Sequence, residues 1–126
     1  MDWKDLSRDN FASAQKLRDD GDPRFWRSSV NRSYYAAYCA AAMHLCTPGR
    51  RFPHGRNNPD HGQLATLIGA LSSIPVSDRR KVQHQLRSLR EARTTADYRP
   101  GRTITQYDSI AAVKSAAVVL ILLGIQ

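Results

Sequence analysis

The sequence has 126 residues, the length of one ordinary domain and too short for two. Its apolar fraction of 41% and charged fraction of 24% are close to globular averages and exclude wholesale disorder. The net charge is +8 and unevenly spread, since residues 1–22 hold four basic and six acidic side chains and residues 23–126 hold fifteen and five. A basic body favours an anionic partner, and nucleic acid is the first candidate.

No apolar run follows the N-terminal Met1, so we expect no signal peptide. The longest apolar stretch, residues 115–126, is about 12 residues long, whereas a membrane span needs roughly 20. Cys39 and Cys46 would lie two turns apart on one helix, too far for a disulfide, and no CxxC pair indicates zinc. We therefore expect a cytoplasmic protein without membrane contact, metal or cofactor.

Five helical segments are predicted in chain order. The first covers roughly residues 3–18, where a loose apolar stripe includes Leu6 and Phe11. The second begins with Asp22 as the N-cap and Pro23 at the first helical position, and runs to about Cys46.

Residues 47–59 are rich in Pro, Gly, Asn and Arg and predict a mobile loop. Asn58-Pro59 starts a third helix that ends near residue 71, and Ser77 caps a fourth that reaches about residue 98. Thr103 or Thr105 caps a fifth, which runs to the C-terminus; Thr103 and Gln106 have capping-box spacing. Four long helices and one short one predict an all-α fold over residues 1–126, an antiparallel four-helix bundle with an additional short helix.

Arg93 breaks the apolar stripe of the fourth helix. The stripe reads Val82, Leu86, Leu89, Arg93 and Ala96, with spacings of 4, 3, 4 and 3 residues, so Arg93 falls on the inward face. A buried arginine is costly unless it is paired, and Asp97 lies one turn further on. Two interpretations stay open: a structural Arg93–Asp97 pair that fixes packing, or a cationic site at a cleft or a dimer seam.

A second polar face lies on the second helix, beside its core stripe. Asn31, Tyr35 and Tyr38 share this face, and a mid-helix Asn is unfavourable unless its amide has a partner. We expect either a polar helix–helix contact or a group that faces the same cleft as Arg93. Tyr34 and Tyr35 are expected to pack, with their hydroxyls bonded at the rim.

Three pieces of sequence together resemble the HEPN family, and in particular the small HEPN proteins that accompany a nucleotidyltransferase. They are Asn31-Arg32-Ser33-Tyr34-Tyr35-Ala36 on the second helix, His61 at the opening of the third, and Arg93-Thr94-Thr95-Ala96-Asp97-Tyr98 at the end of the fourth. Their order and spacing match over nearly the whole chain. The resemblance implies a helical bundle that forms a homodimer and has an RNA-linked or defence-linked role, and it makes Tyr98 a motif residue.

The resemblance leaves open whether the chain cuts RNA. Ribonuclease members of the family carry an Arg, then four to six residues, then a His that acts as a metal-independent general base. Arg90 could match the motif arginine, but Ala96 stands where the histidine is expected. Two other pairs have the required spacing from Arg to His, namely Arg56 with His61 and Arg79 with His84. With fifteen arginines in the chain, about one such match is expected by accident.

The sequence thus predicts a HEPN-type binding or regulatory protein of a toxin–antitoxin or defence-type system. Its expected partners are a second copy, a nucleotidyltransferase and RNA. Alternatives are a metal-independent endoribonuclease toxin and a structural adaptor that binds no nucleic acid. An RNA surface is expected on five exposed basic residues of the fourth helix: Arg79, Arg80, Lys81, Arg87 and Arg90. The fifth helix is apolar nearly all round, which predicts a C2 homodimer.

Overall fold

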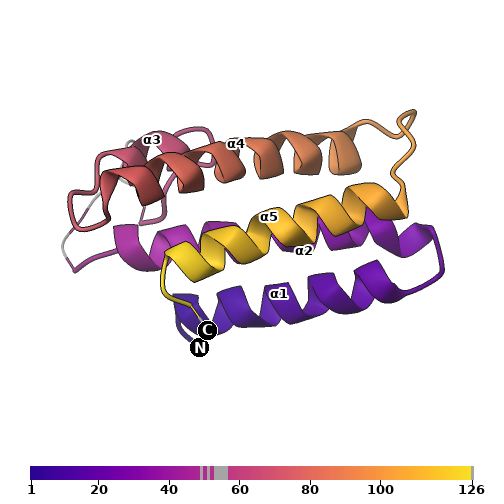
Figure 1. The fold of residues 1–126 in the computed structure, drawn as a ribbon, viewed down its shortest axis with the longest axis horizontal. Helices are drawn as coiled ribbons and strands as arrows, with labels where there is room; N and C mark the ends of the chain where they lie inside the picture. The colour runs from indigo at the N-terminus through magenta and orange to yellow at the C-terminus, as the bar shows by residue number, and fades with distance from the viewer. Residues whose placement is uncertain (49, 51, 53–56, 126) are drawn as a thin grey trace.

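A computed structural model describes residues 1–48, 50, 52 and 57–125 of the chain. The described part contains five α-helices and no strand, which confirms the predicted all-α fold. Their bounds are α1 (Trp3–Asp19), α2 (Arg24–Leu45), α3 (Leu64–Gly69), α4 (Val76–Tyr98) and α5 (Gln106–Leu122). Four of them are long, and α3 is a short helix beside the first half of α4 (Figure 1).

The central element is α2, which contacts each of the other four helices. In Figure 1, α1 lies below it, α5 runs along it, and α3 and α4 form the upper layer. Small side chains allow this close packing, because a run of alanines on α2 is fully buried: Ala36, Ala37, Ala40, Ala41 and Ala42. The larger core side chains include Leu45 of α2, Ile68 of α3 and the α4 stripe predicted from the sequence.

Buried serines join the helices, and most of their hydroxyls are hydrogen-bonded. The Ser7 hydroxyl of α1 donates to the Ala36 carbonyl at 2.7 Å, and the Ser29 hydroxyl of α2 donates to the Ala14 carbonyl at 2.8 Å. Ser109 of α5 donates in turn to the Ser29 oxygen at 2.8 Å. A serine takes little more room than an alanine, so these positions combine close helix approach with satisfied polar groups.

The predicted starts of the first and fifth helices are confirmed. A capping box formed by Asp2 and Asp5 begins α1 at Trp3, and of the two expected caps of α5 it is Thr105, with Asp108, that forms the capping box, rather than Thr103 with Gln106. The α2 helix starts one residue later than predicted, although the Asp22 side chain still accepts a bond from the Arg24 amide at 3.0 Å.

Ser77 does not cap α4, because this helix already begins at Val76 after Pro75. The predicted start of the third helix at Asn58-Pro59 is also wrong. The Pro59 carbonyl instead accepts a bond from the Tyr38 hydroxyl at 2.8 Å, and the Asp60 side chain accepts one from the Gly62 amide at 2.7 Å. These contacts fix residues 60–63 as a turn and delay α3 to Leu64. Part of the predicted loop, including Arg56, lies outside the described residues.

Both cysteines are free thiols, as expected from their spacing. Burial raises the pKa of the Cys39 thiol to about 11, so this group stays protonated at neutral pH. Within the described ranges, none of the helices is long and apolar enough to cross a bilayer.

Candidate nucleic-acid interface

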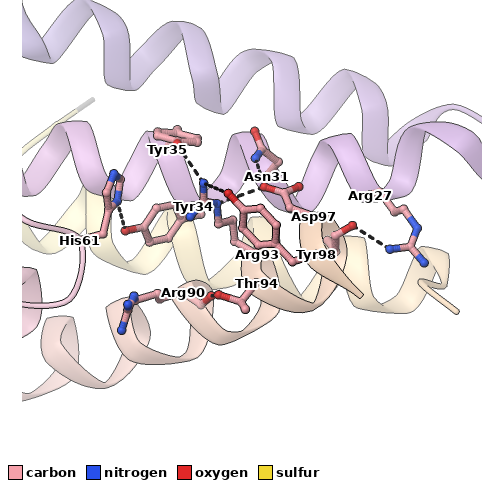
Figure 2. Close-up of polar contacts among 11 residues, drawn as sticks. Arg27, Asn31, Tyr34, Tyr35, His61, Arg90, Arg93, Thr94, Asp97 and Tyr98 are labelled. Carbon is pink, nitrogen blue, oxygen red and sulfur yellow. Dashed lines mark hydrogen bonds and ion pairs between the residues drawn. The ribbon is translucent and has the colours of Figure 1, made fainter. Parts of the chain in front are cut away.

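Arg93 is the centre of a polar cluster between α2 and α4 (Figure 2). Its Nε lies 3.1 Å from Asp97 Oδ2, and only 16% and 25% of the two side chains are exposed. Its Nη2 donates to the Tyr35 hydroxyl at 3.2 Å and makes a longer contact of 3.4 Å with the Tyr98 hydroxyl. The predicted inward position of Arg93 and its pairing with Asp97 are therefore both confirmed.

The guanidinium of Arg93 also lies among aromatic rings. Its Cζ is 5.6 Å from the ring centre of Tyr34, 5.5 Å from that of Tyr35 and 5.3 Å from that of Tyr98. These distances allow cation–π attraction, which offsets part of the cost of removing the charge from water. The arginine is held by a carboxylate at one edge and by tyrosines around it.

Asn31 completes the cluster from α2. Its Nδ2 donates to Asp97 Oδ2 at 2.7 Å, so this carboxylate oxygen accepts from both Asn31 and Arg93 (Figure 2). This contact explains how a mid-helix asparagine is tolerated, and it is the polar helix–helix contact that was one of the two expectations for this face of α2. The cluster ties the middle of α2 to the last two turns of α4.

His61 joins the cluster from the segment before α3. Its Nδ1 lies 2.6 Å from the Tyr34 hydroxyl, and its ring stacks on Tyr38 with the ring centres 4.6 Å apart. Burial, with a further contribution from the positive charge of Arg93, lowers the pKa of His61, while Asp60 opposes the shift. His61 is therefore neutral at pH 7.

The two tyrosines against His61 remain protonated. Burial raises the pKa of Tyr38 to about 12 and that of Tyr34 well above its ordinary value. Tyr38 donates to the Pro59 carbonyl, so its role is to fix the segment that carries His61. The expectation that Tyr34 and Tyr35 pack with their hydroxyls bonded is confirmed by the contacts of Tyr34 with His61 and of Tyr35 with Arg93.

A groove of about 520 Å³ opens beside this cluster, between α3 and α4. Tyr34 and His61 lie along its α2 side, and three arginines line it against a single acidic residue, Glu91. The arginines are Arg87, Arg90 and Arg99, and Thr66, Thr94 and Thr95 also line it, the Thr94 hydroxyl donating to the Arg90 carbonyl at 2.9 Å. Guanidinium and hydroxyl donors in a partly enclosed groove are suited to a phosphate-bearing ligand.

The predicted basic residues of α4 are divided between different environments. Arg87 and Arg90 are exposed and line the groove, whereas Arg80 and Lys81 are exposed outside its lining. Arg79 was expected to be exposed but is half-buried, because its Nη1 donates to the Gly69 carbonyl at the end of α3 at 2.8 Å.

The predicted pair of Arg79 and His84 is not brought together by the helix. Five residues rotate about 140° around a helix axis, so the two side chains leave α4 on different sides. His84 is exposed and is not among the residues that line the groove. The pair of Arg56 and His61 cannot be placed, since Arg56 lies outside the described residues. Among the residues that the structure describes, His61 is the histidine that lines the groove.

Arg27 is a structural residue that the sequence did not single out. Its Nη1 donates to the Ala96 carbonyl at 2.7 Å (Figure 2). Its Nη2 contacts the carbonyls of Pro100 and Arg102. Because the Ala96 carbonyl lies in the last turn of α4, the cation there complements the negative end of the α4 dipole. The contact holds the exit of α4, where Arg99 faces the groove.

Other groove residues, among them Thr66, Glu91 and Arg99, were also absent from the predicted site. Arg99 could have been found, since it directly follows the Asp97-Tyr98 motif in a basic stretch. Among the residues that the structure describes, no cluster of His, Cys, Asp or Glu has the arrangement of a metal site.

These features define a class of protein: a bundle of four long helices with one short helix, whose polar cluster of Asn, Tyr, His, Arg and Asp side chains borders a basic groove. The HEPN domain family matches residues 1–125, and the chain belongs to this family. No curated protein and no solved structure matches the chain. Membership of the family indicates a nucleic-acid-related or toxin- and defence-type role.

Proposed function

We propose that this HEPN protein binds RNA through the groove between α3 and α4. The observation that carries the proposal is the groove itself, where Arg87, Arg90 and Arg99 face one volume with only Glu91 opposing them. Phosphate contacts from arginines and hydroxyls supply most of the affinity of sequence-independent RNA binding. The role is that of a binding and regulatory component of a toxin–antitoxin or defence-type system.

The test compares two variants with the same loss of charge on the same helix. In Arg87→Ala/Arg90→Ala the groove loses two cations, whereas in Arg80→Ala/Lys81→Ala the loss lies outside the groove lining. Binding of labelled single-stranded RNA is measured by fluorescence anisotropy over a series of salt concentrations. The groove variant should bind at least about tenfold more weakly, and its salt slope should fall by roughly one to two units, while the control stays close to the parent.

Two results would contradict RNA binding at this groove. One is an equal loss of affinity in the groove variant and the control variant, because affinity would then follow total charge rather than the groove. The other is no detectable binding by the parent protein at about 50 mM salt, where phosphate contacts are strong.

The proposal includes two protein partners. A second copy of the chain would cover the exposed apolar side chains of α5, where Ile121 is 72% exposed and Val118 also reaches solvent. The family resemblance supports a nucleotidyltransferase as the other partner. Co-expression of the chain with a candidate nucleotidyltransferase, followed by co-purification, tests that pairing.

A second candidate function is a metal-independent ribonuclease in which His61 replaces the missing motif histidine. The position of His61 favours this candidate, because a neutral histidine lines the same groove as Arg90. In the tautomer in which Nδ1–H donates to the Tyr34 hydroxyl, Nε2 is the free acceptor and would take the proton from a ribose 2′-hydroxyl. Incubation with RNA and EDTA should then give ends with a 2′,3′-cyclic phosphate that disappear in His61→Gln. Intact RNA would leave binding as the function.

A further inference from the structure

Tyr98 is a large aromatic side chain that is both exposed and held in place. It is 66% exposed at the end of α4, yet its ring lies over the Arg93 guanidinium and its hydroxyl faces Arg93 Nη2. Figure 2 shows the ring folded back along α4 toward the polar cluster. An exposed aromatic normally samples several rotamers, so a fixed exposed ring is a feature that requires an explanation.

The support beneath the ring is rigid. Arg93 is fixed by Asp97 and Tyr35, and Asp97 is fixed in turn by Asn31 from α2. The Tyr98 ring therefore rests on a guanidinium that is held from both α2 and α4. A preorganised aromatic surface loses little conformational entropy when a planar ligand stacks on it.

Tyr98 is not among the residues that line the arginine groove, but its neighbours along α4 are. Arg90, Thr94 and Tyr98 follow one another at four-residue intervals on one side of α4, so Tyr98 lies about 12 Å along the axis from Arg90. Thr94 and Arg99 line the groove on either side of Tyr98 in the sequence. A strand with its phosphates on the groove arginines would need to extend only along α4 to meet the ring.

We propose that Tyr98 is a stacking platform for an unpaired nucleobase of an RNA strand whose phosphates lie in the arginine groove. This inference rests on the proposed RNA binding and specifies its ligand as single-stranded. An unpaired base presents its flat face to an aromatic side chain, whereas the bases of a duplex are already stacked on one another. Stacking of this kind tolerates any base, so binding depends little on sequence.

The chain offers a control, because Tyr107 is another exposed tyrosine, 77% accessible in the first turn of α5. Neither tyrosine lines the groove, but Tyr98 lies between the groove residues Thr95 and Arg99, whereas Tyr107 is on another helix. Affinities of Tyr98→Ala, Tyr98→Phe and Tyr107→Ala are measured with a labelled single strand and with a duplex of equal length. Tyr98→Ala should weaken single-strand binding roughly tenfold without changing the salt slope. Tyr98→Phe, which keeps the ring, and Tyr107→Ala should remain within about twofold of the parent.

A second measurement covers the possibility that Tyr98→Ala disturbs Arg93. In Tyr98→Trp, the additional indole emission should be quenched by the single strand and not by the duplex. If Tyr98→Ala binds like the parent while Arg87→Ala/Arg90→Ala is weakened, RNA binding stands and the stacking platform is refuted. An equal loss of single-strand and duplex binding in Tyr98→Ala also refutes it. If the parent binds neither RNA, the proposed function itself fails.

Discussion

Replacing Arg93 with alanine should destabilise the fold by an amount between the values for a surface pair and a buried pair. Breaking a fully buried ion pair costs about 3–5 kcal/mol, and breaking an exposed one costs about 1 kcal/mol or less. Arg93 and Asp97 are 16% and 25% exposed, and after the substitution Asp97 still accepts the bond from Asn31. The lost contacts with the tyrosine rings add about 0.5–1 kcal/mol each at most. We therefore expect a loss of about 2–3 kcal/mol.

Urea unfolding followed by circular dichroism measures this loss, and the melting temperature should fall by roughly 8 °C or more. Arg90→Ala is the control, since Arg90 is exposed three residues earlier on α4 and should change stability by less than about 0.5 kcal/mol. A double-mutant cycle with Asp97→Ala separates the pair from other losses. If Arg93→Ala unfolds within about 0.5 kcal/mol of the parent, the cluster does not hold α2 and α4 together and the reasoning fails.

Three further predictions follow from single contacts. The pKa of His61 is lowered in the folded state, so the unfolded chain binds more protons as the pH falls below about 6.5. The free energy of unfolding should therefore decrease as the pH drops from there. His61→Gln should show a smaller decrease when urea unfolding is measured over a series of pH values. A Cβ at Gly69 would collide with the side-chain amide of Gln83, which donates to the Ala65 carbonyl. Gly69→Ala should therefore destabilise the fold by about 1 kcal/mol in thermal melts. In a Gln83→Ala background the same substitution should be neutral or stabilising. Ile121→Lys should convert the proposed homodimer into a monomer by light scattering; a parent protein that is monomeric at micromolar concentration would contradict the dimer.

The number and order of the helices could be predicted because their apolar stripes are long. The stripe of α4 places Val82, Leu86 and Leu89 in the core, where all three are buried. Helix starts were less predictable, since several local signals compete for the same residues. Asn58-Pro59 has the form of a helix start, but a long-range bond from Tyr38 to the Pro59 carbonyl uses this segment to hold His61. Propensity within a short window cannot detect a contact with a helix twenty residues away.

The candidate site, too, could be predicted from the sequence only in part. Arg93 could be found because a charge in an apolar stripe violates the helical period, and Asp97 because it lies one turn further on. The violation shows that a partner is needed, but not which other residues supply it. Contacts of Arg93 with Tyr35 and of His61 with Tyr34 join segments far apart in the sequence, and only the packing of α2 against α4 places them together.

The charge count of α4 overstates the cations that are free to bind phosphate. Arg79 is engaged with the Gly69 carbonyl, while Arg80 and Lys81 lie outside the groove lining. If all five predicted basic residues contacted phosphates, the logarithm of the binding constant for a single strand would fall with the logarithm of salt at a slope of about −3.5. Three groove arginines, Arg87, Arg90 and Arg99, give about −2 instead. The salt slope of the parent protein therefore distinguishes a ligand confined to the groove from one spread over the basic surface of α4, and we expect the shallower value.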